Sequence, residues 1–359
     1  MTPEKSISKG FRMEELLRCY FLKAGYYAVR GVPFVYEGFD VTDVDIWLYG
    51  RTSPVSREII IVDCKNKKTP QALERIFWAK GLADALKASR AIVATTDTRP
   101  EVKAFGKQVD ILILDGKFLN RLSSAENPLD CRLSEEEFLS KISDYTFSKI
   151  DGDWRSRYVR CKALLTQGLS FDSCNEWLMH GHFFAEQAIV RSGQREIALR
   201  CFYFICSLIS IAVENALKEL SFLEHAERAA RISEGFTYGS NGIAGMKRIL
   251  DVSMGLLEQY APGGNSISRQ VRHNVENGFS NLDTHILGEY FAKQEVGRSL
   301  FSVGRELEEL AMNRGFKNHL EASIEARSLL YCILDFWGID RIAISNETYP
   351  TTNQPDLNL

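Results

Sequence analysis

The hydrophobic pattern changes character near residue 120, and this change constrains the fold more than any other feature of the chain. Before it, short runs rich in β-branched and aromatic residues alternate with segments of helical spacing. After it, almost every periodic segment is helical. The two patterns predict an α/β region followed by a larger all-α region.

The first part of the chain predicts an ordered series of elements. In chain order these are a helix at 9–24, strands at 26–29, 33–36, 44–49 and 58–64, a helix at 70–89, a strand at 91–96, a helix at 100–107 and a strand at 111–114. Gly25 is the stop signal of the first helix, and Thr69 and Pro70 suit the N-cap and first turn of the second. Strand–helix–strand alternation favours a mixed, partly parallel sheet flanked by helices.

The whole chain is predicted to divide into two domains, a linker region and a tail. Residues 1–122 form the α/β domain, 123–150 a linker region, 151–342 the α-helical domain and 343–359 a polar, disordered tail. The helical segments are expected at 135–142, 175–191, 195–231, 242–260, 268–276, 283–315 and 320–337.

Charge and apolar content indicate which partners the chain can have. Residues 1–125 hold 20 Lys and Arg against 15 Asp and Glu, and the remainder holds 24 against 32. A polyanionic partner is therefore compatible only with the first part. The most apolar window, 201–213, is uncharged for only 13 residues, whereas a membrane span needs about 20. We expect a buried helix there and no membrane partner.

The eight cysteines show neither a CxxC pair nor zinc-finger spacing. They are expected to be buried free thiols, as in a reducing compartment. The N-terminal residues lack the apolar core of a signal peptide. Together these features predict a cytoplasmic protein.

One short motif has the composition of a catalytic site. Asp63-Cys64-Lys65 ends the predicted strand 58–64, and residues two apart on a strand point to the same face. Asp63 and Lys65 should therefore project together, with the Cys64 backbone carbonyl between them. Asp45, on what should be the neighbouring strand, supplies a second carboxylate. Burying such a carboxylate without a partner is costly, and a metal ion is one such partner.

The strand around Asp45 is predicted to have two different faces. Asp43, Asp45 and Trp47 alternate onto one side, and the opposite, core-facing side is made by Val44, Ile46 and Leu48. Trp47 has two interpretations: it stacks on a base or it packs, and packing is favoured.

These residues resemble a known family when they are taken in order. Met13-Glu14, Gly25-Tyr26, Val44-Asp45-Ile46, Asp63-Cys64-Lys65 and Ala94-Thr95-Thr96 resemble the motifs of the PD-(D/E)XK endonucleases, specifically the Mrr-type restriction-endonuclease-like domain. The resemblance covers residues 10–96, about a quarter of the chain. Met13 stands for the usual Phe, Asp43 for a frequent Gly, and Asp63 is the rarer acid at its position.

The resemblance implies an α/β restriction-endonuclease-like fold and a metal-dependent endodeoxyribonuclease. Glu14, Asp45, Asp63 and the Cys64 carbonyl would hold Mg²⁺, for which Mn²⁺ can substitute, and Lys65 would be the catalytic lysine. Hard cations of this kind take oxygen ligands and activate water for phosphodiester hydrolysis. The family suggests defence against foreign DNA, or repair. In the alternative without catalysis, Asp45 and Asp63 are solvent-facing charges and Lys65 is their salt-bridge partner.

Several basic residues flank the proposed site and are candidates for DNA backbone contact. They are Lys67, Lys68, Arg75 and Lys80, together with Arg51. Each is equally compatible with a solvated surface.

A weaker resemblance lies in the helical part. Residues 207–220 and the later 271–278 are similar to HEPN helical domains, whose ribonuclease motif ends in His-Gly. Arg272 and His273 fit the motif, but Asn277 stands where its histidine belongs. We therefore favour a non-catalytic helical domain for oligomerisation, as in a homodimer, for regulation or for partner recognition. An RNase site at Arg272 and His273, and a catalytically inactive nuclease fold that only binds nucleic acid, are the alternatives.

Overall fold

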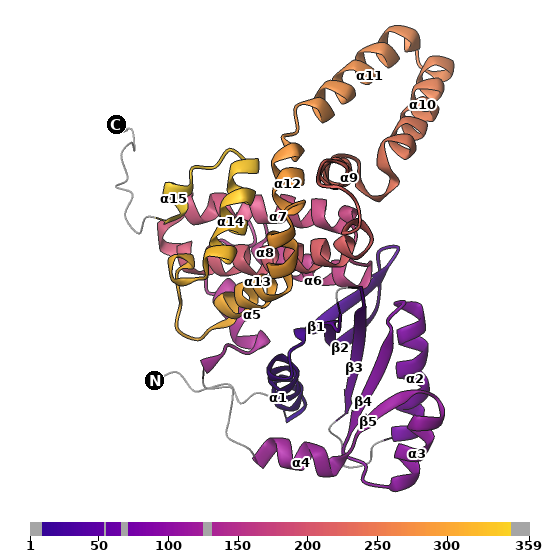
Figure 1. Cartoon of the computed structure of the whole chain (residues 1–359), viewed down its shortest axis with the longest axis vertical. Coiled ribbons are helices and arrows are strands. Elements are labelled where there is room, and N and C mark those ends of the chain that lie inside the picture. Colours follow the sequence, from indigo (N-terminus) through magenta and orange to yellow (C-terminus); the bar gives the residue numbers. More distant parts are fainter. Residues whose placement is uncertain (1–8, 54, 66–70, 125–130, 346–359) are drawn as a thin grey trace.

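The computed structural model describes residues 9–53, 55–65, 71–124 and 131–345 of the chain. A five-stranded mixed sheet with flanking helices is followed by a mainly helical region, as Figure 1 shows. The predicted order of an α/β layer and then helices is confirmed at this level.

The elements of the α/β region are close to those predicted. They are α1 (Lys9–Lys23), β1 (Tyr27–Tyr36), β2 (Phe39–Arg51), β3 (Arg57–Lys65), α2 (Ala72–Ala85), β4 (Arg90–Thr95), α3 (Pro100–Gln108), β5 (Ile111–Leu114) and α4 (Gly116–Ser124). The two strands expected at 26–29 and 33–36 are one strand, β1, which continues through Gly31 at φ +59°. Thr69 and Pro70 lie outside the described residues, and α2 has Gln71 at its N-cap.

The sheet has the strand order β1-β2-β3-β4-β5. β1, β2 and β3 form an antiparallel meander, whereas β3, β4 and β5 are parallel and are joined through α2 and α3. The carboxyl ends of the three parallel strands therefore lie at one edge of the sheet, where ligands commonly bind in α/β folds. Asp63 and Lys65 come from this end of β3.

Both faces of β2 are buried, which corrects the prediction that only Val44, Ile46 and Leu48 face a core. Ile46 and Leu48 pack against α1, and Trp47 and Tyr49 belong to a second cluster. That second cluster runs without a break from the sheet into the helical region. The two parts of the chain therefore share one hydrophobic core.

The helical region is built around α8 (Arg195–Leu220), nearly all of which is buried. Its other helices are α5 (Glu135–Ser143), α6 (Trp154–Ala163), α7 (Phe171–Val190), α9 (His225–Tyr238), α10 (Gly242–Tyr260), α11 (Gly264–Ser280), α12 (Thr284–Phe291), α13 (Gln294–Met312), α14 (Ile324–Phe336) and α15 (Arg341–Ser345), with short 3-10 turns between some of them.

Two of the predicted helices are each two helices. The segment 195–231 breaks after α8 and resumes as α9, and the segment 283–315 divides into α12 and α13. Arg228 explains the first break, because its guanidinium donates to the carbonyls of Leu220 and Leu223 at the end of α8.

The apolar window 201–213 lies within α8. One helical stretch among the described residues, Ser192–Leu220, is long and apolar enough to cross a membrane, and 94% of its most apolar window is buried inside the fold. Such burial is that of a core helix, as predicted. All eight cysteines are free, and all but the exposed Cys131 are buried.

Part of the range predicted as a linker, 123–150, is folded. Residues 116–124 form α4, and α5 begins with a capping box between Ser134 and Glu137. The predicted tail 343–359 lies outside the described residues beyond Ser345.

Candidate active site

Asp45 and Lys65 meet where the pairing of β2 with β3 ends. The last paired residues of the two strands are Ile46 and Val62. Beyond them, the backbone N–H of Cys64 donates to Asp45 Oδ2 at 2.6 Å. Lys65 Nζ lies 3.9 Å from the same carboxylate oxygen. A carboxylate from β2 is thus fixed against the end of β3 by one hydrogen bond and one cation.

Asp63 is held by an arginine from α2. The Arg75 guanidinium makes a bidentate contact with the Asp63 carboxylate, with Nε 2.8 Å from Oδ2 and Nη2 against Oδ1. The Asp63 side chain is 7% exposed and the Arg75 side chain 25%. Arg75 also lies over the ring of Trp78, 5.5 Å from its centroid. Of the basic residues that were predicted to contact DNA and that the structure describes, Arg75 is in direct contact with the proposed site.

Glu14 reaches the site from α1 and is held by Arg30 of β1. The Arg30 Nε donates to Glu14 Oε2 at 2.8 Å. The same guanidinium, 3% exposed, binds Glu15 at 2.8 Å and Glu136 at 2.7 Å. Arg30 and Glu136 were not singled out in the sequence, because they are 106 residues apart and only the fold brings α5 to β1.

Burial has shifted Asp45 and Glu14 toward their neutral forms. It raises the pKa of Asp45 to about 6, against the opposing effects of the Cys64 N–H and Lys65; the charges of Asp63 and Glu14 raise that pKa further. Burial also raises the pKa of Glu14, although Arg30 opposes this. A carboxyl group whose pKa is raised by burial and by neighbouring acids is typical of functional sites.

The described residues do not contain a group of three or more His, Cys, Asp or Glu side chains arranged to hold a metal ion. The reason is visible in the contacts above, since Arg75 occupies Asp63 and Arg30 occupies Glu14. Of the acids Glu14, Asp45 and Asp63, Asp45 has the most distant counter-charge, since Lys65 Nζ lies 3.9 Å from its carboxylate. Two carboxylates plus waters and a phosphate are nevertheless a sufficient ligand set for Mg²⁺.

The remaining predicted contact residues lie in different places. Lys67 and Lys68 are outside the described residues. Lys80 is exposed and lies 3.9 Å from Asp84 on the surface of α2. Arg51 is at the far end of β2, six residues from Asp45, or about 20 Å at the usual rise of a strand. The prediction that Arg51 flanks the site is therefore wrong.

Trp47 packs in the core, as favoured. Its side chain is 1% exposed and is stacked with Tyr49 at a centroid distance of 6.3 Å. A base has no access to it.

Arg272 and His273 lie on α11, which forms a helical hairpin with α10 that projects from the rest of the molecule (Figure 1). The Arg272 Nη2 donates to Asp251 of α10 at 2.7 Å. His273 is exposed and its Nε2 lies 3.0 Å from the Asn277 amide nitrogen. The proposed RNase residues are thus on a solvent-facing helix, about a turn from the asparagine that replaces the motif's histidine.

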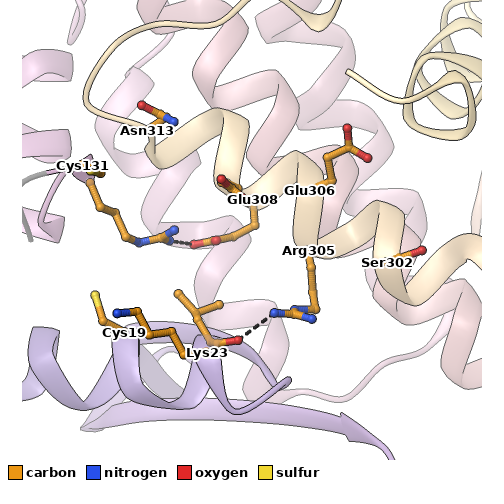
Figure 2. A pocket seen from close by; sticks show the side chains of 11 residues that line it. Cys19, Lys23, Cys131, Ser302, Arg305, Glu306, Glu308 and Asn313 are labelled. Carbon is orange, nitrogen blue, oxygen red and sulfur yellow. Dashed lines mark hydrogen bonds and ion pairs between the residues drawn. The ribbon is translucent and has the colours of Figure 1, made fainter. Parts of the chain in front are cut away.

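A separate cavity of about 470 Å³ lies between α1 and α13. Arg305 and Glu308 line it, as Figure 2 shows; Glu308 pairs with Arg132, and the Arg305 Nη2 donates to the Leu22 carbonyl at 2.7 Å. Asp45, Asp63 and Lys65 are not among the residues that line it. We regard this cavity as a seam between the sheet region and the helical region.

No family model, no curated protein and no solved structure matches this chain. The residues and their geometry therefore carry the functional argument.

Proposed function

We propose that the chain is a metal-dependent endonuclease that hydrolyses DNA phosphodiester bonds at Asp45, Asp63 and Lys65. The observation that supports this is convergence. Asp45 from β2 and the Asp63–Lys65 segment of β3 are far apart in sequence, yet Asp45 contacts the Cys64 N–H and Lys65 at the end of β3, and the charge of Glu14 from α1 raises the pKa of Asp45. These are the residues that the PD-(D/E)XK resemblance requires.

The order of elements also supports the proposal. The resemblance requires a helix with Glu, a strand entered at Asp, a strand ending in D-x-K, then a helix and an apolar strand. The chain has α1, β2, β3, α2 and β4 in this order, with the acids at the corresponding positions. The proposed site also lies at the carboxyl end of a parallel strand, the usual place of ligands in such sheets.

The donor chemistry fits a hard divalent cation at two of the three acids. The Asp45 carboxylate is buried, which raises its pKa, so a nearby cation would stabilise its ionised form, and Asp63 is a second carboxylate, which Arg75 binds. The Cys64 carbonyl is a further oxygen donor in the same segment. Mg²⁺, when bound, supplies charge neutralisation at the phosphate and a more acidic water.

The chain's own residues have separate tasks in this scheme. Asp45 and Asp63 would hold the cation, and Lys65 would orient the attacking water, since its ammonium group lies beside Asp45 and can donate hydrogen bonds. Arg75 is placed to transfer from Asp63 to a phosphate of the substrate, which guanidinium groups bind in a bidentate manner.

A plasmid-nicking assay tests the proposal. The wild type, Asp63→Ala and Lys65→Ala are compared in Mg²⁺ and in EDTA. The matched control is Asp43→Ala, which removes an exposed acid from the same strand as Asp45. We expect nicking by the wild type and the control in Mg²⁺ only, and a loss of about 10²-fold or more in the other two variants. Equal cleavage by all four proteins would reject the proposal.

The same assay separates the alternatives. DNA binding without cleavage by the wild type would indicate an inactive nuclease fold. RNA cleavage lost in Arg272→Ala but kept in Asp63→Ala would indicate an RNase in the helical part.

A further inference from the structure

A second charged cavity lies at the opposite end of β2 and β3 from Asp45. It has a volume of about 220 Å³ and lies where the β2–β3 hairpin meets the ends of α8 and α12 and the start of α13. Five of its ten lining residues are cationic and none is acidic: Arg51, Arg57, Arg228, Lys293 and Arg298. We ask how these five charges are balanced.

One buried carboxylate serves two of the arginines. Glu214 of α8, which is fully buried, lies 2.5 Å from Arg57 Nη2 and 3.3 Å from Arg51 Nε. It also accepts a hydrogen bond from the Tyr49 hydroxyl at 2.5 Å. Two guanidinium groups thus share a single negative charge, which leaves one positive charge in excess.

Arg228 adds a further charge that no acid balances among the residues described. Its side chain is buried and donates to backbone carbonyls, including Ala292 at 2.7 Å and Leu223 at 2.6 Å. Carbonyl dipoles at helix ends satisfy its hydrogen bonds but carry only partial charge.

Lys293 and Arg298 are exposed and have no ion pair within residues 9–53, 55–65, 71–124 and 131–345. Arg51 Nη1 donates to the backbone carbonyl of Arg298 at 3.1 Å, which holds the β2 end against α13. Gln294 and Gly297 of the first turn of α13 also line the cavity. Excess cations and a small volume together suit a compact anion.

We propose that this cavity binds the phosphate group of a ligand. Lys293 and Arg298 can donate to a tetrahedral anion with more than one negative charge, and Arg57 and Arg228, whose donors are engaged by Glu214 and by backbone carbonyls, add positive charge around the same small volume. The phosphate can belong to a free mononucleotide or to a nucleic-acid backbone. An adjoining cavity shares Lys293 and Gln294 but is also lined by Glu224 and Glu295, which disfavours a long polyanion and favours the small ligand.

The proposed phosphate site is independent of the proposed hydrolysis. It lies about 20 Å along β2 from Asp45, by the rise of a strand, and it needs no metal ion. Its test therefore uses binding in EDTA and no cleavage.

Isothermal titration calorimetry of the full chain tests the proposal with three probes: inorganic phosphate, AMP and a short DNA duplex. The variant is Lys293→Glu/Arg298→Glu, two exposed positions whose replacement leaves the core intact. The matched control is Lys317→Glu, an exposed lysine of the helical region that does not line the cavity. Circular dichroism melting confirms that all three proteins are folded.

We expect binding of phosphate and AMP to the wild type and the control, weakened by about tenfold or more in the double variant. If only the duplex binds, and the double variant weakens it, the phosphate belongs to a nucleic-acid backbone. Absence of binding to any probe, or equal binding by the double variant and the control, overturns the proposal.

Discussion

The two ends of β2 and β3 solve the problem of buried charge in different ways. At one end, Asp45 is paired with Lys65 and Asp63 with Arg75, while Glu14 shares Arg30 with Glu15 and Glu136; all three cations come from the sheet region. At the other end, two arginines share one acid, and this acid comes from α8 in the helical region.

The difference separates the proposed catalytic site from a joint between two regions. Burial destabilises the ionised form of Asp45, as its raised pKa shows, so this residue costs stability at neutral pH. Glu214, in contrast, lies between two guanidinium groups and a tyrosine hydroxyl and connects α8 to the β2–β3 hairpin. Removing an acid should therefore have opposite effects on stability at the two ends.

Glu214→Gln should have the largest effect on stability. It leaves Arg57 largely buried without a counter-charge, and we expect the free energy of unfolding to fall by about 3–5 kcal/mol. Urea denaturation followed by circular dichroism measures the loss. Tyr49→Phe is the control, because it removes one hydrogen bond to the same carboxylate and should cost only about 1 kcal/mol. A similarly small loss of unfolding free energy in both variants would mean that the Glu214 charge does not hold α8 to the β2–β3 hairpin.

Asp45→Asn should instead stabilise the protein at neutral and alkaline pH. The pKa of Asp45 is about 6 in the folded chain and near 3.8 when unfolded, so the folded state holds the proton to higher pH. Wild-type stability should therefore decrease as the pH rises from about 4 to about 6, and this decrease should be complete above that range.

The asparagine cannot ionise and keeps an oxygen that accepts the Cys64 N–H. We expect it to add about 2–3 kcal/mol at pH 8 and almost nothing at pH 4, in EDTA, although it abolishes Mg²⁺-dependent cleavage. Urea denaturation at both pH values measures this. A destabilised variant at pH 8 would show that the Asp45 carboxylate is an ordinary stabilising charge.

Arg75→Ala tests the role of the cation beside Asp63 and should have a smaller effect than the two variants above. It frees the Asp63 carboxylate, which is buried, so the metal-free protein should lose stability and Mg²⁺ should restore it. We expect Mn²⁺ affinity without DNA to increase about tenfold, the equivalent of one charged hydrogen bond. Electron paramagnetic resonance of free Mn²⁺ measures the affinity. Arg99→Ala, which removes an arginine from the more exposed pair with Asp97, is the control. Unchanged affinity would remove Arg75 from the account of the site.

The fold of the α/β region could be predicted from the sequence because segments with the apolar spacing of a strand alternate with segments that have the apolar spacing of a helix. The burial of both faces of β2 was missed, although the nearly continuous apolar run 44–49 is typical of a strand covered on both sides. The breaks after α8 and α12 were missed because the helical spacing of apolar residues continues across them, and only the tertiary position of Arg228 accounts for the first.

The acids of the candidate site were accessible as well, because short spacing on adjacent strands places them together. Lys65 was anticipated as a salt-bridge partner and Arg75 as a flanking residue, but the pairs made between distant parts of the chain were not. Arg30 and Glu136, and Arg57 and Glu214, are separated by more than a hundred residues, and long-range pairs of this kind follow from packing, which no local pattern encodes. The exclusion of Arg51 from the site also depends on strand direction, because β2 carries it away from Asp45.

The central claim is that Asp45 and Asp63 share a divalent cation, and Mn²⁺ binding in crystals tests it most directly. Anomalous scattering should reveal a Mn²⁺ peak between the two carboxylates, with the Cys64 carbonyl among its ligands and Arg75 turned away from Asp63. The peak should be absent in crystals of Asp45→Asn. A Mn²⁺ soak that leaves the Asp63–Arg75 pair intact, with no peak beside Asp45, would contradict the account.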